Sequence, residues 1–377
     1  MEYAFISHAS AVEATWSLAR AKGFSPLDDE GIWMLPSPEH CVTTQEALEQ
    51  LMEMDGFKGL GLRSRPIDLL VPTVSSRSRG KLLTCHVWNG FFPERAFIRV
   101  HERVFVSSPL FTVLQLALAP HPSRLSRRLA EEAAAEDARI RHELGMEGAA
   151  AAAQELLAWE AIAREARAIR TMTDFAGTYR PATSPRDGTS YDTAPLMTCD
   201  DLKSFLDSQP SMRGARKGYG VAARAFDRSG SPMETALALL LTLPVEMGGF
   251  GLPRPALNRS VPLSPTDRGL TSQEEMIADL CWEHEGLVIE YDSWERHGRL
   301  GAAKIAKDHA RANSLTALGW KTLTVGYAQV ASVQGMALLA RQAARLLGCE
   351  LAESTDLQKI WRSRLHALLM PQDERHA

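Results

Sequence analysis

Three carboxylates stand close together in the second half of the chain, on two segments that we expect to be neighbouring strands. Asp279 lies within the apolar run 277–282, and Glu290 and Asp292 end the β-branched run 287–292. Because strand side chains alternate between faces, Glu290 and Asp292 project to the same side. Gathered carboxylates repel one another unless a cation or bound protons compensate their charge. Hard oxygen ligands suit Mg²⁺ or Mn²⁺, so the pattern predicts a divalent metal site.

A fourth carboxylate, Glu234, comes shortly before the acidic strands. It is the third residue of a helix predicted from Ser231-Pro-Met-Glu234, in which the serine caps the helix and the proline occupies the first position. Two roles remain open for Glu234. It closes a capping box on its own helix, or it presents a carboxylate to the same metal.

The elements expected around these residues form an α/β layer. The predicted strands and helices, in chain order, are 256–261, 277–282 and 287–292 (strands), 299–318 (helix), 320–325 (strand), 329–347 and 356–370 (helices). This order is typical of an α/β layer with a partly parallel sheet. The helix over 299–318 brings Lys304, Lys307, Asp308 and Arg311 near one face.

The first third of the chain is predicted to be a separate α+β unit. A helix starts at Ser7 or Ser10, and a second helix covers 107–118. Apolar alternation broken by turn residues predicts short strands at 32–35, 67–71, 82–88, 96–100 and 103–106. His8 is open to a catalytic interpretation or a local one, in which it hydrogen-bonds at the helix entry. The local interpretation is favoured, because no acidic or thiol partner lies nearby in sequence.

Helices are expected between these two parts. Residues 120–175 are rich in Ala, Glu, Arg and Leu, and Gly145 and Gly148 are expected to divide them into two helices. A long loop rich in turn-forming residues follows at 178–196. We therefore divide the chain into an α+β domain at 1–120, a helical region at 121–228, an α/β domain at 229–350 and a helix with a tail at 351–377.

Charge and cysteine use limit the classes of function. The 377 residues carry a formal net charge of −4, which argues against wholesale binding of polyanions, although basic residues cluster at 76–81 and 211–218. The five cysteines are scattered and never spaced as a metal-binding pair, which fits a reducing cytoplasm and argues against zinc. We find no signal-like start and no apolar run that would span a bilayer, so we expect a cytoplasmic protein with no membrane partner.

Motifs in the first third resemble the AbiEi-type antitoxin and transcriptional-regulator family, in the part that follows its winged-helix head. The resemblance rests on Ile6-Ser-His-Ala-Ser-Ala-Val12, Arg79-Gly-Lys-Leu-Leu-Thr-Cys-His-Val87 and the run 104–117. We expect no separate DNA-reading head, because the chain begins at the first of these motifs. The resemblance implies a protein partner encoded nearby.

The segment from Ser229 to about Val330 resembles the Vsr-like branch of the PD-(D/E)xK nuclease superfamily. The matching features are Ser231-Pro-Met-Glu234, Leu257-Asn258, Ala278-Asp279-Leu280, Leu287-Val-Ile-Glu-Tyr-Asp292, His297, Asp308 through Arg311, and Leu318-Gly-Trp320. The resemblance implies a restriction-endonuclease-like mixed sheet flanked by helices. It also implies that Asp279 and Glu290 hold a divalent cation, and that Asp292, which replaces the lysine of the parent pattern, is an additional ligand.

Other residues of this segment would complete the chemistry. His297 would move a proton or bind phosphate, and Lys304 or Lys307 would stabilise the charge of a pentavalent phosphorus in place of the absent lysine. For the two lysines the other interpretation, solvated charges on a helix, is favoured. Family members commonly have a glycine and an arginine where this chain has Ser293 and Thr324.

These observations predict a metal-dependent endonuclease that hydrolyses DNA in defence, repair or mobile-element control. The alternative is a nucleic-acid-binding regulator or antitoxin-like protein that retains a nuclease fold without turnover. The three carboxylates Asp279, Glu290 and Asp292 favour the enzyme. The acidic overall charge and Thr324 favour the alternative.

Overall fold

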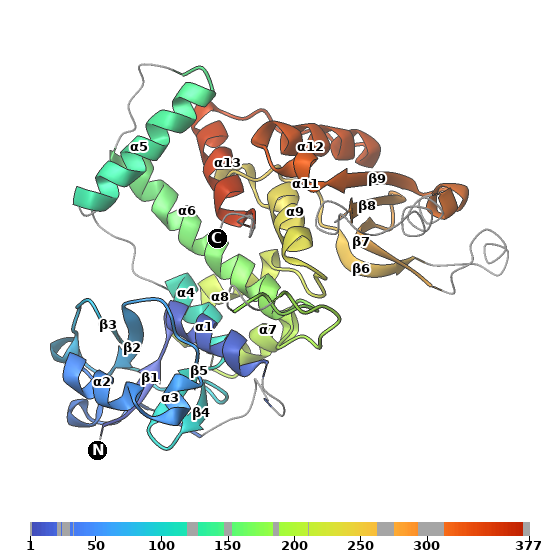
Figure 1. The fold of residues 1–377 in the computed structure, drawn as a ribbon. Helices are drawn as coiled ribbons and strands as arrows, with labels where there is room; N and C mark the ends of the chain where they lie inside the picture. Colours follow the sequence, from blue (N-terminus) through green and yellow to red (C-terminus); the bar gives the residue numbers. More distant parts are fainter. Residues whose placement is uncertain are drawn as a thin grey trace. The chain divides into compact units, whose positions relative to one another are not determined.

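The computed structural model divides the chain into two compact units (Figure 1). It describes residues 2–20, 24, 31–32, 34–118, 127–146, 153–183, 188–209, 211–261, 275–292 and 313–371. Unit 1 consists of residues 1–120, 167–227 and 374–377, and unit 2 consists of residues 121–166 and 228–373. Each unit has its own sheet, so the predicted mixed α/β class is confirmed.

Unit 1 is built on a sheet of five strands in the order β3-β2-β1-β5-β4. The strands are β1 (Ala4–Ile6), β2 (Ile67–Val71), β3 (Leu83–Val87), β4 (Phe97–His101) and β5 (Val104–Ser107). The central strand β1 pairs parallel to β5 and antiparallel to β2, which in turn pairs parallel to β3. All three residues of β1 are buried, as expected for a central strand covered on both faces.

Helices cover the sheet of unit 1. They are α1 (His8–Leu18), α2 (Gln45–Met52), α3 (Asp55–Lys58), α4 (Pro109–Leu118), α7 (Cys199–Asp207) and α8 (Ala215–Arg224), with 3-10 turns at Pro38–His40 and Val74–Ser76. Helix α4 contacts α1, α7 and α8. Phe111 of α4 meets Phe97 of β4, Phe92 and Trp88 in an aromatic cluster, with ring centroids 4.8–5.6 Å from Phe111.

One prediction for unit 1 fails near its N-terminal end, because the described residues of the predicted strand 32–35 belong to no strand. The helix predicted to start at Ser7 or Ser10 is confirmed as α1, with Ser7 as its N-cap, whereas the strand β1 before it was not predicted. Three residues are too few to show an alternating pattern, so β1 is specified by its pairing rather than by its sequence. The other four predicted strands and the helix over 107–118 are confirmed within one or two residues.

Unit 2 has a four-stranded sheet in the order β6-β7-β8-β9. The strands are β6 (Ala256–Val261), β7 (Met276–Trp282), β8 (Leu287–Asp292) and β9 (Lys321–Gly326). Strands β6, β7 and β8 pair antiparallel, whereas β8 and β9 pair parallel. The predicted partly parallel sheet is therefore confirmed.

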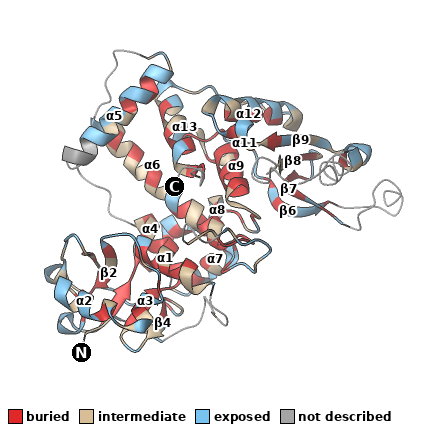
Figure 2. Cartoon of the chain, in the orientation of Figure 1, coloured by how far each residue is buried: buried red, intermediate tan, exposed pale blue. Residues whose placement is uncertain are grey.

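Of the helices of unit 2, α9 (Pro232–Thr242) is buried at every residue from Met233 to Leu241 (Figure 2). The others are α5 (Arg127–Glu143), the first part of α6 (Ala153–Phe175), α11 (Tyr327–Val330), α12 (Val333–Leu347) and α13 (Asp356–Leu369). The predicted helix 299–318 lies mostly outside the described residues. In its described part, residues 313–317 are helical. In the ranges that the structure describes, we find no helix long and apolar enough to cross a membrane.

A buried ion cluster joins α5 to α13. Asp137 of α5 accepts from Arg141 at 2.5 Å and from Arg364 of α13 at 3.3 Å. Arg364 also donates to the carbonyl oxygen of Ala133 at 3.0 Å. A buried carboxylate shared by two guanidinium groups has its charge compensated and its lone pairs used, which is the condition under which burial of charge is tolerated.

The turn after α9 should be intolerant of side chains. A Cβ on Gly249 would lie 1.9 Å from the carbonyl oxygen of Leu243, a backbone atom that cannot step aside. We expect Gly249→Ala to lower the free energy of unfolding by more than ~3 kcal/mol. Urea denaturation checks this. The control is Gly326→Ala, whose nearest atom would be 3.9 Å away. Equal stability of the two variants would contradict the packing of this turn.

Candidate functional site

Four polar residues lie in one row across the sheet of unit 2. They are Asn258 in β6, Asp279 in β7, Glu290 in β8 and Thr324 in β9. In the pairing of β6 with β7, the residues before and after Asn258 pair with those after and before Asp279, so these two side chains lie opposite each other. Glu290 pairs directly with Thr324. The register of β7 and β8 places Glu290 beside Asp279, one residue beyond their last paired residues. Adjacent strands are about 4.8 Å apart, so this row brings the side chains within reach of one another.

Asp279 is held where the pairing between β7 and β8 ends. Its Oδ2 accepts a hydrogen bond of 2.7 Å from the backbone N–H of Tyr291, so the side chain replaces a backbone acceptor. The residue is half-buried. The sequence pattern that placed an acid among apolar neighbours thus corresponds to a carboxylate fixed on a rigid strand.

Glu234 approaches this row from the first turn of α9. Its side chain is buried, and Oε2 accepts from the backbone N–H of Gly230 at 2.7 Å and from Nδ2 of Asn258 at 2.6 Å. A Cβ on Gly230 would lie 3.0 Å from the same oxygen, so the absence of a side chain there permits the approach. Asn258 has a φ of +45°, a conformation that asparagine tolerates better than most residues.

Of the two open roles of Glu234, the structure bears on the first, the capping of its own helix. The predicted cap is confirmed, because Oγ of Ser231 accepts from the N–H of Glu234 at 3.1 Å. The carboxylate, however, reaches back to Gly230, one residue before the cap, and also contacts strand β6 through Asn258. Glu234 therefore stabilises the start of its helix while facing the acidic row.

Burial and charge together make Glu234 a weak acid. Burial, followed by the negative charge of Asp279, raises the pKa of Glu234 from 4.5 to about 7, although hydrogen bonds from Gly230, Asn258 and Ser231 act in the opposite direction. Near neutral pH the carboxyl group is thus poised between its two protonation states. A proton or a cation is needed to offset the charge that Glu234 and Asp279 would otherwise share.

The structure brings some of the predicted site residues together. Glu234 and Asp279 influence each other directly, and Glu290 lies next in the row, whereas Asp292 lies two residues further along β8 on the same face. Glu290 and Asp292 are half-buried. The pattern had not named Asn258 as a site residue; the available signal was an amide within a predicted strand.

Other predicted residues lie outside the described residues. These are His297, Lys304 and Lys307, together with Asp308 and Arg311. Within the ranges that are described, no group of three or more His, Cys, Asp or Glu side chains is arranged to hold a metal ion. Glu234 and Asp279 nevertheless fit a hard cation in donor chemistry, because positive charge would relieve the repulsion between them.

No protein-family model, no curated protein and no solved structure matches the chain. The site is therefore defined by its own geometry: the hydrogen bonds that Glu234 accepts from Gly230 and Asn258, and the one that Asp279 accepts from Tyr291.

The raised pKa of Glu234 makes stability depend on pH. The folded state binds this proton more tightly than the unfolded state, so the stabilisation is complete below about 4.5 and is lost as the pH rises through about 7. The loss amounts to about 3 kcal/mol. Glu234→Gln cannot ionise, and we expect it to gain stability relative to wild type between pH 5 and pH 8.

Urea denaturation of both proteins at these two pH values measures the effect. Glu246→Gln is the matched control, because Glu246 belongs to the same unit and is exposed. Parallel pH profiles for wild type and Glu234→Gln would show that Glu234 ionises normally and would remove the electrostatic argument for this site.

Proposed function

We propose that unit 2 is a divalent-metal-dependent endonuclease that hydrolyses phosphodiester bonds in DNA. One observation carries the proposal. Glu234 from α9 and Asp279 from β7 are held so close that burial and the charge of Asp279 raise the pKa of Glu234 to about 7. Strongly perturbed pKa values arise where carboxylates are held together against repulsion, and such places are enriched in functional sites.

Within this proposal, the acidic side chains of the row and Glu234 are the ligands of the cation. Asp279 and Glu290 would hold the cation, with Asp292 and Glu234 as further ligands. Mg²⁺ or Mn²⁺ would polarise a phosphodiester oxygen and lower the pKa of a bound water. Asp279 is already oriented by the N–H of Tyr291. A carboxyl group whose pKa is about 7, as in Glu234, is also suited to take a proton from an attacking water at neutral pH.

The choice of DNA as substrate is supported by the resemblance to the Vsr-like branch of PD-(D/E)xK nucleases. The resemblance covers the segment that forms α9 and β6 to β9. In this proposal His297 moves a proton or binds phosphate, and Lys304 or Lys307 stabilises the developing charge on phosphorus. A role in defence, repair or mobile-element control belongs to the same proposal.

A second candidate function is a nucleic-acid-binding regulator or antitoxin-like protein without turnover. Three observations favour it. Oε2 of Glu234 already accepts two hydrogen bonds, and no three-residue metal group is found among the described residues. Thr324, at the end of the row, offers no positive charge to a phosphate. In this case the acidic row would serve to fix α9 on the sheet.

Cleavage assays with Asp279→Asn test the enzyme proposal. The amide oxygen of asparagine can still accept from the N–H of Tyr291, so the strand end is preserved while the charge is lost. We expect wild type to nick plasmid DNA with Mg²⁺ or Mn²⁺, and the variant to be slower by roughly 100-fold or more. Glu283→Gln, an exposed residue just beyond β7, should cleave like wild type.

A second measurement separates metal binding from substrate choice. At pH 8, Mg²⁺ should raise the Tm of wild type and leave that of Asp279→Asn unchanged. Metal binding without DNA cleavage would reject DNA as the substrate. Absence of both effects, with retained binding of oligonucleotides, would support the regulator instead.

A further inference from the structure

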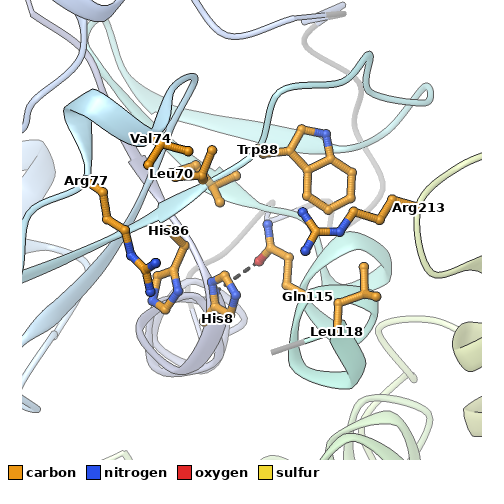
Figure 3. Close-up of a pocket in the computed structure, with 10 residues that line it drawn as sticks. His8, Leu70, Val74, Arg77, His86, Trp88, Gln115, Leu118 and Arg213 are labelled. Atoms are coloured by element: carbon orange, nitrogen blue, oxygen red, sulfur yellow. Dashed lines mark hydrogen bonds between the residues drawn. The ribbon is translucent and has the colours of Figure 1, made fainter. Parts of the chain in front are cut away.

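Unit 1 contains a cavity of about 190 Å³ whose polar lining is entirely basic or neutral (Figure 3). The polar residues that line it are His8, Arg77, His86, Trp88, Gln115 and Arg213. In the described part of the chain, no acidic side chain contributes to the lining. This cavity belongs to unit 1 alone and is unrelated to the acidic row of unit 2.

Two histidines stack at the base of the cavity. The ring of His8, from α1, lies on the ring of His86, from β3, with centroids 3.8 Å apart and planes inclined by 23°. Nε2 of His86 is 2.8 Å from Oδ1 of Asp68, which lies on the neighbouring strand β2. A carboxylate on one ring nitrogen fixes the orientation of an imidazole.

His8 is held in a strained position. Its φ is +48°, which is unfavourable for a residue with a side chain. The backbone N–H of His8 donates to Oε1 of Gln115 at 3.0 Å, and its ring Nδ1 lies 3.0 Å from Oγ of Ser7. Gln115 is buried and is fixed by a 2.9 Å bond to Oγ of Ser107. Such strain persists where surrounding contacts over-determine it, often at binding sites.

Positive charge is concentrated around this pair. Figure 3 shows Arg77 reaching down beside His86, while Arg213 reaches toward Gln115 and Trp88 from the other side. Both arginines are exposed. Within the described residues, neither forms an ion pair. Burial, and then the neighbouring His86, lower the pKa of His8 well below its ordinary value. Among the described residues that line the cavity, no carboxylate balances the charges of Arg77 and Arg213.

The loop that carries Arg213 is itself constrained. Gly214, the next residue, has a φ of +90°, and a Cβ on it would lie 2.4 Å from the side chain of Leu118. Leu118 ends α4 and also lines the cavity. This close approach fixes the backbone next to Arg213, whose side chain lines the cavity.

We propose that this cavity binds a small phosphate monoester, with the phosphate between Arg77, Arg213 and the stacked histidines. Two guanidinium groups and two imidazoles offer more donors than the two oxygens of a carboxylate can use, and they match the three terminal oxygens of a phosphate monoester. Pockets for drug-sized ligands have volumes of about 300–1,000 Å³. A cavity of about 190 Å³ therefore limits the organic part of the phosphate monoester to a few atoms.

Titration calorimetry of the full chain, with inorganic phosphate and glycerol phosphate as probes, tests the proposal. We expect both to bind at neutral pH, and Arg77→Gln and Arg213→Gln each to weaken binding about tenfold. The matched controls are Arg79→Gln and Arg216→Gln. These arginines are exposed in the same two segments but do not line the cavity. Both should bind like wild type.

Three outcomes would overturn the proposal. Phosphate would not bind at all, acetate would bind as tightly as phosphate, or the control variants would lose as much affinity as the cavity variants. A 5′-phosphorylated oligonucleotide provides a further arm. If it binds while glycerol phosphate does not, the surface recognises nucleic acid and not a small ligand. His86→Gln, with folding checked by circular dichroism, should abolish the preference for phosphate over acetate.

Discussion

The arrangement of unit 2 depends on a carboxylate held where packing removes most of its water. Helix α9 is buried along almost its whole length, so its first turn cannot move away from the sheet. Glu234 is consequently kept beside Asp279, and the repulsion between them is moderated by Gly230 and Asn258 rather than by solvent. Burying Glu234 near Asp279 costs free energy, and the hydrophobic burial of the other residues of α9 offsets this cost.

Much of unit 2 could be predicted because its signals are local. Strands β7 and β8 are apolar runs separated by turn residues, and Ser231-Pro232 marks the start of α9. The meeting of Glu234 with Asn258 could not be predicted in this way, because it joins a helix to a strand through tertiary packing. The unusual φ of Asn258 likewise has no signature in the sequence. Local patterns therefore located the acids but not the packing that buries Glu234 near Asp279 and raises its pKa.

For His8, the sequence predicted the local contact but not the long-range one. Its predicted local hydrogen bond is present, since Nδ1 lies near Oγ of Ser7. In the folded chain the ring of His8 also gains a neighbour that is distant in sequence, because it stacks on His86. His86 brings Asp68 into the same group through the parallel pairing of β2 and β3. Parallel strands join residues that are distant along the chain, so proximity in sequence is a poor guide to side-chain clusters built on them.

The ion cluster around Asp137 has a consequence for biosynthesis. Asp137 lies on α5, in a segment of unit 2 that is made before residues 167–227 of unit 1, whereas its partner Arg364 lies on α13. On the ribosome, α5 is synthesised before the rest of unit 1 and before most of unit 2, at about 5–20 residues per second. During this time Asp137 has Arg141 as a partner but lacks Arg364. The buried ion cluster of unit 2 is therefore completed only after α13 has been synthesised.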